Sequence, residues 1–267
     1  MKNDLFSIGN FTIHGYGLMI ALGFLLCVIM GMYRAKRLKL DPEAILDIAL
    51  IGLVVGFVGA KLLYIIVEFP TFLKDPMRVV GSEGFVVYGG IIAGALSAMV
   101  YCRRKKLVFL DYFDLAAPSI ALAQGVGRIG CLLAGCCYGR ETSCPIGIVF
   151  PEGSLAPAGV KLIPTQILSS AGDLLIVVIL LLFHKRAKHR GDVGALYMLL
   201  YGVGRFLIEF LRSDDRGAVG FLSTSQLISI FIVIGAALLF MSNRRRGAKV
   251  PSEEAAATKE RSENDTL

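Results

Sequence analysis

The stretch from Gly125 to Gly139 reads Gly-Val-Gly-Arg-Ile-Gly-Cys-Leu-Leu-Ala-Gly-Cys-Cys-Tyr-Gly. It ends a long apolar run and begins the longest loop of the chain. If the run crosses a membrane, Arg128 lies where the hydrocarbon gives way to water. An arginine at that depth is costly unless it is paired or faces a cavity, so it indicates a functional site. The alternative is an arginine that reaches the interface with its head group and anchors the helix end.

The whole chain has the composition of a membrane protein. Hydrophobic residues make up 55% of its 267 residues, and the mean hydropathy is +0.67. Because backbone polar groups must be satisfied within each segment in lipid, runs of about 20 apolar residues predict helices. We therefore expect an all-α membrane protein with about seven transmembrane helices and no cleaved signal peptide. The runs are Tyr16–Met32, Ala44–Val67, Phe85–Cys102, Tyr112–Ile129, Gln166–Phe183, Val193–Leu211 and Phe221–Met241.

The positive charges are placed asymmetrically along these runs. The chain carries a net charge of +7, and clusters of Lys and Arg follow the first, third, fifth and seventh runs. Since cytoplasmic loops are enriched in Lys and Arg, the pattern predicts a periplasmic N-terminus and a cytoplasmic C-terminus. Nucleic-acid binding is the rival explanation, and it is disfavoured because the clusters lie at helix ends rather than on one face.

The domain organisation follows from the same pattern. We expect residues 1–241 to form one integral membrane domain that starts with a short polar lead. Residues 242–267 are polar and rich in Ala, Ser, Glu and Lys, which predicts a disordered cytoplasmic tail.

The sixth run carries a row of polar side chains. Tyr201, Arg205, Glu209 and Arg212 are spaced four, four and three residues apart, so in a helix they share one face. Arg205 and Glu209 are predicted to form an ion pair one turn apart. A stripe of this kind in hydrocarbon favours a functional site, and the alternative is a ladder of ion pairs that fixes helix packing. The fifth run shows no comparable feature.

Four of the six cysteines lie close together in the sequence, at positions 131, 136, 137 and 144. A disulfide is one option in an oxidising compartment. A zinc site is the less favoured option, because the adjacent Cys136 and Cys137 fit tetrahedral spacing poorly and no histidine is near. We therefore expect no metal and no cofactor.

The two arginines and three tyrosines suggest the ligand. Arg128 and Arg205 carry planar guanidinium groups, which suit phosphate recognition, and Tyr16, Tyr88 and Tyr201 lie at similar depth. An anionic lipid head group is the natural ligand there. No sequence motif of a serine hydrolase or a metallohydrolase is present.

Several motifs in this order resemble the bacterial phosphatidylglycerol–prolipoprotein diacylglyceryl transferase family. The most extensive is the segment from Gly127 to Gly139. The others are His14-Gly-Tyr16-Gly-Leu, Tyr88-Gly-Gly-Ile-Ile-Ala-Gly, Pro164-Thr-Gln166 and Tyr201-Gly-Val-Gly-Arg205-Phe-Leu-Ile-Glu209-Phe-Leu-Arg212. The resemblance covers about residues 10–241. In the motif that begins at Tyr88, this tyrosine stands where the best-known members of the family have histidine, whereas other members have tyrosine.

The resemblance implies an enzyme of lipoprotein biosynthesis in the cell inner membrane. The diacylglyceryl group of phosphatidylglycerol would pass to the thiol of the lipobox cysteine in a prolipoprotein signal peptide. A thioether forms, and glycerol phosphate leaves. No nucleic acid takes part.

The resemblance also assigns roles to residues. Catalysis would involve Arg128, Arg205, Tyr88 and Glu209, with Glu209 orienting Arg205. Substrate binding would involve Arg128, Tyr16, Tyr201, Gly139, Gly89 and Gly90, the glycines giving room for the lipid. The alternative function is a non-enzymatic lipid or small-anion transporter that uses the same arginine-lined cavity.

Overall fold

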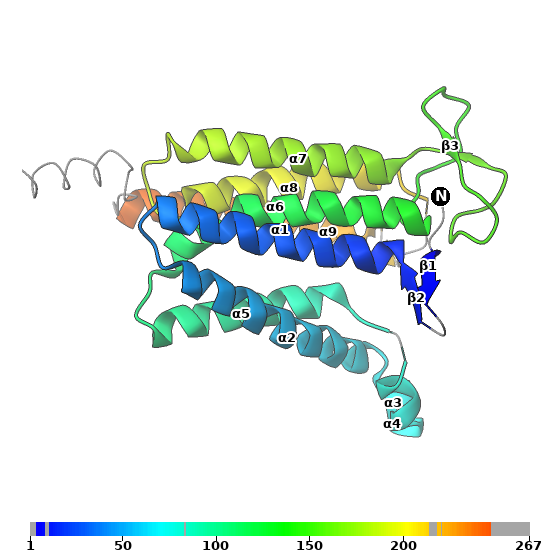
Figure 1. Ribbon diagram of the computed structural model, residues 1–267, viewed down its shortest axis with the longest axis horizontal. Coiled ribbons are helices and arrows are strands. Elements are labelled where there is room, and N and C mark those ends of the chain that lie inside the picture. The colour runs from blue at the N-terminus through cyan, green and yellow to red at the C-terminus, as the bar shows by residue number, and fades with distance from the viewer. Residues whose placement is uncertain (1–3, 9–10, 83, 214–217, 220, 247–267) are drawn as a thin grey trace, which may run out of the picture.

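The computed structural model describes residues 4–8, 11–82, 84–213, 218–219 and 221–246 (Figure 1). Within these residues the long elements are all helices, and three short antiparallel strand pairs lie in the connecting segments. The helices are α1 (Gly15–Arg37), α2 (Pro42–Val67), α3 (Phe69–Lys74), α4 (Pro76–Val80), α5 (Val87–Arg104), α6 (Phe109–Ala134), α7 (Thr165–His184), α8 (Asp192–Glu209) and α9 (Thr224–Arg246). The strands are β1 (Asp4–Ile8), β2 (Phe11–His14), β3 (Ile148–Val149), β4 (Lys161–Leu162), β5 (Ala218–Val219) and β6 (Leu222–Ser223).

Local sequence signals explain where key helices begin and end. The side chain of Asp41 accepts a hydrogen bond from the Glu43 backbone N–H, and Pro42 occupies the first position of α2. Both residues are typical of a helix N-terminus. The C-terminus of α6 is set by Gly135, which adopts a left-handed φ of 73°. That conformation stops the helix and turns the chain at the end of the glycine-rich stretch.

Two groups of helices make up the molecule. The first is a bundle in which α1 packs on α6, α6 on α7 and α8, and α8 on α9. The second is the pair α2 and α5, which pack mainly on each other. In Figure 1 this pair lies beneath the bundle and diverges from α1 toward the end that carries α3 and α4.

A cluster of buried side chains joins the two groups at the other end. It contains residues from the end of α1, the start of α2, the end of α5 and the start of α6: Ala35, Ala44, Ile45, Cys102, Tyr112 and Leu115. Arg34 is buried beside this cluster and donates a hydrogen bond to the backbone carbonyl of Leu115. This cluster therefore holds the α2–α5 pair against the bundle at that end.

Glycines allow α2 and α5 to approach closely. A Cβ at Gly89 would lie 2.4 Å from the carbonyl oxygen of Gly59, and one at Gly90 would lie 2.9 Å from that of Gly56. Neither position has room for a side chain. Gly52 lies outside this close contact, since a Cβ there would meet no atom within 4 Å.

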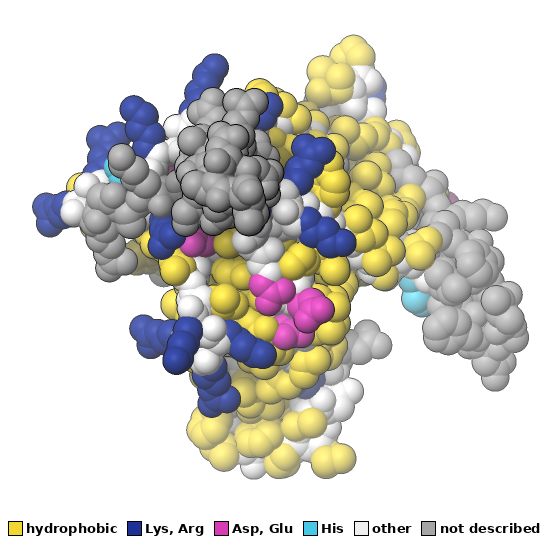
Figure 2. Space-filling model, turned by 60° about the vertical axis from the view of Figure 1, so that its left-hand side comes forward, with side chains coloured by type: hydrophobic (Ala, Val, Ile, Leu, Met, Phe, Trp, Pro, Cys, Tyr) yellow, Lys and Arg dark blue, Asp and Glu magenta, His cyan; other side chains and the backbone are white. Residues whose placement is uncertain are grey.

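The protein is an all-α membrane protein. Five helices of the described part are long and apolar enough to cross a bilayer, namely α1, α2, α6, α7 and α9. The third and sixth runs also form helices, α5 and α8, each of 18 residues. In Figure 2 the Lys and Arg side chains gather around the end of the molecule that faces the viewer, and the surface to the right of and below this end is largely hydrophobic. This is the end at which α1, α5, α7 and α9 terminate (Figure 1).

The structure adds two features at the ends of the chain. The short polar lead contains a β-hairpin, in which β1 pairs with β2. At the other end, α9 continues to Arg246, so the helix includes the first five residues of the segment 242–267. The rest of the tail that we expected to be disordered, residues 247–267, lies outside the described residues.

Candidate active site

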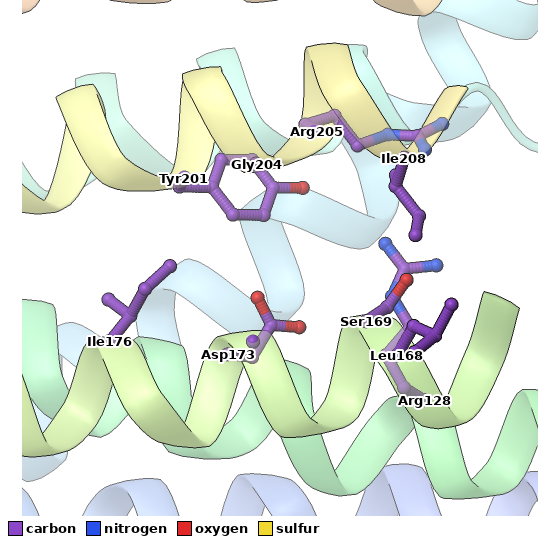
Figure 3. Close-up of a pocket in the computed structure, with 10 residues that line it drawn as sticks. Arg128, Leu168, Ser169, Asp173, Ile176, Tyr201, Gly204, Arg205 and Ile208 are labelled. Atoms are coloured by element: carbon purple, nitrogen blue, oxygen red, sulfur yellow. The ribbon is translucent and has the colours of Figure 1, made fainter. Parts of the chain in front are cut away.

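A cavity of about 120 Å³ lies between α6, α7 and α8 (Figure 3). Arg128 enters it from α6, Asp173 from α7, and Tyr201 and Arg205 from α8. The remaining lining is small or aliphatic: Leu168, Ser169, Gly172, Ile176, Gly204 and Ile208. The cavity has room for several water-sized groups, so it fits a small polar head group better than an acyl chain.

Arg205 is held in place by two neighbours. Its Nη1 lies 2.9 Å from Glu209 Oε2 one turn along α8, and the two side chains are only 9% and 7% exposed. Its Nη2 donates a 2.9 Å hydrogen bond to the hydroxyl of Ser225 at the start of α9. The predicted ion pair is confirmed. A buried guanidinium fixed on two sides presents its remaining N–H groups in one orientation.

Arg212 takes a different place from the one expected on the polar stripe. Helix α8 ends at Glu209, so Arg212 lies beyond it, where its backbone pairs with that of Gly139. Its Nε nevertheless lies 4.0 Å from Glu209 Oε2, and its side chain is 4% exposed. Glu209 is therefore close to two buried arginines.

Arg128 approaches the cavity from the opposite wall. In Figure 3 its side chain extends from α6 toward Arg205. Its electrostatic neighbours are Tyr201, Asp173 and the cysteines 131 and 137. Arg128, Arg205 and Tyr201, which come from two helices, therefore line the same cavity. Two like charges in one buried site favour an anionic ligand between them.

Asp173 is the residue that sequence reasoning missed. It lies near the middle of α7, in the run we took to be featureless, and is 6% exposed. Its electrostatic partners are Arg128 and Arg205, and its Oδ2 has no hydrogen-bond partner among the described residues. The signal was available, because a single carboxylate inside an otherwise apolar span indicates a functional position.

Tyr16 and Tyr88 lie outside the cavity lining but near its residues. Tyr16, in the first turn of α1, is 42% exposed and interacts electrostatically with Arg128. Tyr88, in the first turn of α5, interacts electrostatically with Tyr201. Both tyrosines are therefore placed at the periphery of the site rather than within it.

The three glycines expected to approach the lipid are placed differently. Gly89 and Gly90 pack against α2, as described above, and not against the cavity. The backbone N–H of Gly139 donates a 2.9 Å hydrogen bond to the carbonyl of Ile163. A Cβ at Gly139 would lie 2.8 Å from that oxygen and from the carbonyl oxygen of Leu211. All three positions require glycine for close backbone packing, which is the structural reason for their residue type.

One protein-family profile matches nearly the whole membrane part of the chain. The sequence profile of the prolipoprotein diacylglyceryl transferase family matches residues 3–242. The chain belongs to this family.

Curated relatives support the same assignment. The phosphatidylglycerol–prolipoprotein diacylglyceryl transferase of Clostridium tetani is 46% identical over 92% of this chain and 99% of the relative. The enzyme of that name, numbered 2, from Clostridium perfringens is 44% identical over 95% of this chain and 100% of the relative. The corresponding enzyme of Finegoldia magna is 36% identical over 92% of this chain and 97% of the relative.

In this diacylglyceryl transferase family member, the segment from Gly127 to Gly139 links the cavity to a group of thiols. The Sγ atoms of Cys131, Cys136 and Cys137 all lie within 4.8 Å of one another. Interactions with the other two thiols, together with burial, raise the pKa of the Cys136 thiol, since they stabilise its neutral form. The fourth cysteine of the stretch, Cys144, is exposed and lies outside this group.

Proposed function

We propose that this protein transfers the diacylglyceryl group of phosphatidylglycerol to the cysteine thiol of a prolipoprotein. The thiol sulfur forms a thioether with the glyceryl carbon, and glycerol phosphate leaves. The observation that carries the proposal is the convergence of Arg128 and Arg205 on one cavity in a member of this family. The three relatives described above are all named as transferases, which favours this reaction over the transport of a lipid or small anion.

The arginines supply the electrostatic part of the reaction. The leaving phosphate gains negative charge as the carbon–oxygen bond breaks, and guanidinium groups fixed in a water-poor site stabilise that charge. Arg205 is fixed by Glu209 and Ser225, so little reorganisation is needed when the lipid binds. Glu209 acts as a positioning residue for Arg205.

Asp173 and Tyr201 complete the head-group site. Both face the cavity in Figure 3, and Asp173 has a free acceptor oxygen among the described residues. The glycerol of the phosphatidylglycerol head group carries hydroxyl donors, which a buried carboxylate accepts favourably. We assign these two residues to recognition of the head-group hydroxyls.

Tyr16 and Tyr88 are assigned to the mouth of the site, where the lipid and the acceptor peptide meet. Both lie in the first turn of a helix and near residues of the cavity. An amphipathic phenol suits such an interfacial position, with its ring in lipid and its hydroxyl toward water. The acceptor is the lipobox cysteine of a signal peptide, which arrives within the membrane.

The topology that we propose has seven spans in the cell inner membrane. Helices α5 and α8 cross together with the five more apolar helices, the N-terminus is periplasmic and the C-terminus is cytoplasmic. The basic end in Figure 2 is then the cytoplasmic end. The cavity lies between helices whose glycine-rich loop faces the periplasm, the side on which exported prolipoproteins emerge.

The direct test uses purified protein in detergent, phosphatidylglycerol and a synthetic lipobox peptide, with mass spectrometry of the peptide. The expected product is the peptide plus one diacylglyceryl group. A peptide with serine in place of cysteine should stay unmodified. No mass increase with the cysteine peptide, in protein shown to be folded, would overturn the proposal.

A further inference from the structure

Three thiols converge at a point where the chain leaves α6. Cys131 lies in the last turn of that helix, and Cys136 and Cys137 follow Gly135 in the loop. All three Sγ atoms lie within 4.8 Å of one another, although two of the residues are adjacent in the sequence. No other His, Cys, Asp or Glu of the described chain belongs to the group.

The backbone is bent to bring the adjacent thiols together. In an extended chain, neighbouring side chains point to opposite sides. Cys137 instead has a left-handed φ of 63°, which is uncommon for a residue other than glycine. This conformation places its thiol on the same side as those of Cys136 and Cys131. The adjacency of Cys136 and Cys137, which made a zinc site the less favoured option from the sequence, is therefore no obstacle in the folded loop. Unfavourable backbone conformations of this kind are concentrated at functional sites.

Neighbouring side chains hold the bent loop in position. Gln166 Nε2 donates a 2.7 Å hydrogen bond to the carbonyl of Cys136, and Thr165 Oγ1 donates a 2.5 Å bond to the carbonyl of Cys137. Gln166 and Thr165 are both 1% exposed. The Cys136 N–H also bonds the Cys131 carbonyl at 3.1 Å. The thiols are thus presented by a rigid loop, as a preformed ligand set requires.

We propose that Cys131, Cys136 and Cys137 bind one Zn²⁺ ion and leave its fourth tetrahedral position for the thiol of the acceptor peptide. Zinc–sulfur bonds of about 2.3 Å place tetrahedral sulfur ligands about 3.8 Å apart, which small side-chain adjustments of this cluster achieve. Structural zinc sites have four protein ligands, whereas sites with three keep a position for an exchangeable ligand. Cys136 and Cys137 are partly exposed, so that position is accessible.

The role of the metal rests on the transferase function proposed above. Zinc displaces the protons of the three cysteine thiols, and the acceptor thiol releases its proton to solvent when it coordinates. The coordinated thiolate then attacks the glyceryl carbon that bears the phosphate. The carbon–oxygen bond breaks, and its electron pair leaves with glycerol phosphate. The neutral thioether is a weak ligand and dissociates, which frees the position for the next peptide.

The location of the cluster fits this role. Cys131 follows Arg128 by three residues on α6, so the two lie on about the same side of the helix. Arg128 also interacts electrostatically with Cys131 and Cys137. A zinc ion with four thiolates carries two net negative charges, and the nearby guanidinium offsets part of this charge.

Metal content is the first test. Full-length protein purified in detergent with reductant should bind one Zn²⁺ per chain, measured by inductively coupled plasma mass spectrometry. Protein loaded with Co²⁺ should show a thiolate-to-cobalt charge-transfer band. Cys136→Ser and, separately, Cys137→Ser should each lower zinc affinity at least about 100-fold, whereas Cys144→Ser should leave it unchanged. Sub-stoichiometric zinc, or a disulfide among the three cysteines in protein purified without reductant, would overturn the proposal.

The acceptor position needs a second measurement. Adding the lipobox peptide to the Co²⁺ protein should change the visible cobalt bands, and the serine peptide should not. An unchanged spectrum with both peptides would overturn the assignment of the fourth position. Equal transfer rates in zinc-depleted and zinc-loaded protein would overturn the metal's role but leave the transferase intact. Zinc binding with no transfer under any condition would reject the transferase and leave the metal site.

Discussion

Arg205 and Glu209 form an ion pair of 2.9 Å one turn apart on α8, with side chains 9% and 7% exposed. The pair is buried beside a cavity that Arg128 enters from another helix. Removing one partner of a buried pair leaves the other charge uncompensated, which costs about 3–5 kcal/mol. The relationship between these two residues therefore affects both stability and the orientation of the guanidinium.

The first prediction concerns Glu209→Gln. The amide keeps the shape of the side chain but loses the charge that orients Arg205, so kcat should fall about 100-fold. Transfer to the lipobox peptide and the melting temperature in detergent are the measurements. The exposed Glu152→Gln is the matched control and should behave like the parent protein. Unchanged kcat in Glu209→Gln would remove Glu209 from the positioning role.

The second prediction concerns the shape of the guanidinium groups. Arg205→Lys and Arg128→Lys keep the positive charge but lose the planar array of donors, so each should lower kcat about 100- to 1,000-fold. The exposed Arg78→Lys in α4 should have no effect. If lysine supports full activity at either position, charge alone is sufficient there and phosphate recognition by a guanidinium is wrong.

The third prediction concerns Asp173, which we assign to the head-group hydroxyls. Asp173→Leu should lower kcat/KM for phosphatidylglycerol about 10- to 100-fold, mainly through KM, because a hydrogen bond to a charged acceptor is lost. Asp173→Asn keeps a hydrogen-bond acceptor and should therefore lower kcat/KM less than Asp173→Leu does. Steady-state kinetics with varied lipid measures the effect, with Leu175→Ala on the lipid-exposed side of α7 as the control. An unaltered KM in Asp173→Leu would contradict the assignment.

The fourth prediction separates packing from lipid contact at Gly89. A Cβ there would meet the Gly59 carbonyl at 2.4 Å, so Gly89→Ala should push α2 and α5 apart and destabilise the protein by about 1–3 kcal/mol. Gly59→Ala on the facing helix should do the same, and Gly52→Ala, which meets nothing within 4 Å, should not. Thermal unfolding in detergent reports the difference. A raised KM in Gly89→Ala with unchanged stability would instead restore the expected role in lipid binding.

The apolar runs and the spacing of polar residues within them were sufficient to predict the long helices and part of the candidate site. The apolar runs marked the helices, and the four-residue spacing on the sixth run gave the Arg205–Glu209 pair, because a helix places such residues one above the other. The convergence of Arg128 with Arg205 could be suggested only from their shared depth and chemistry. Only the packing of α6, α7 and α8 shows that the two side chains line one cavity.

Other features depended on backbone geometry that a pattern does not reveal. The roles of Gly89 and Gly139 follow from which backbone atoms lie opposite them, information that depends on tertiary contacts. The cysteine cluster depends on the left-handed conformation of Cys137, for which the sequence offers no signal at a residue other than glycine. Asp173 was a different case, since its charge within an apolar run was visible and was overlooked.

In the proposed reaction the two arginines stabilise phosphate as it leaves the diacylglyceryl group during transfer to a thiol. The most direct measurement follows glycerol phosphate release and peptide modification together, in one reaction with phosphatidylglycerol and the lipobox peptide. We expect equal amounts of glycerol phosphate and diacylglyceryl peptide, with both lost together in Arg205→Ala. Release of glycerol phosphate without modified peptide, or full transfer by Arg205→Ala, would contradict it.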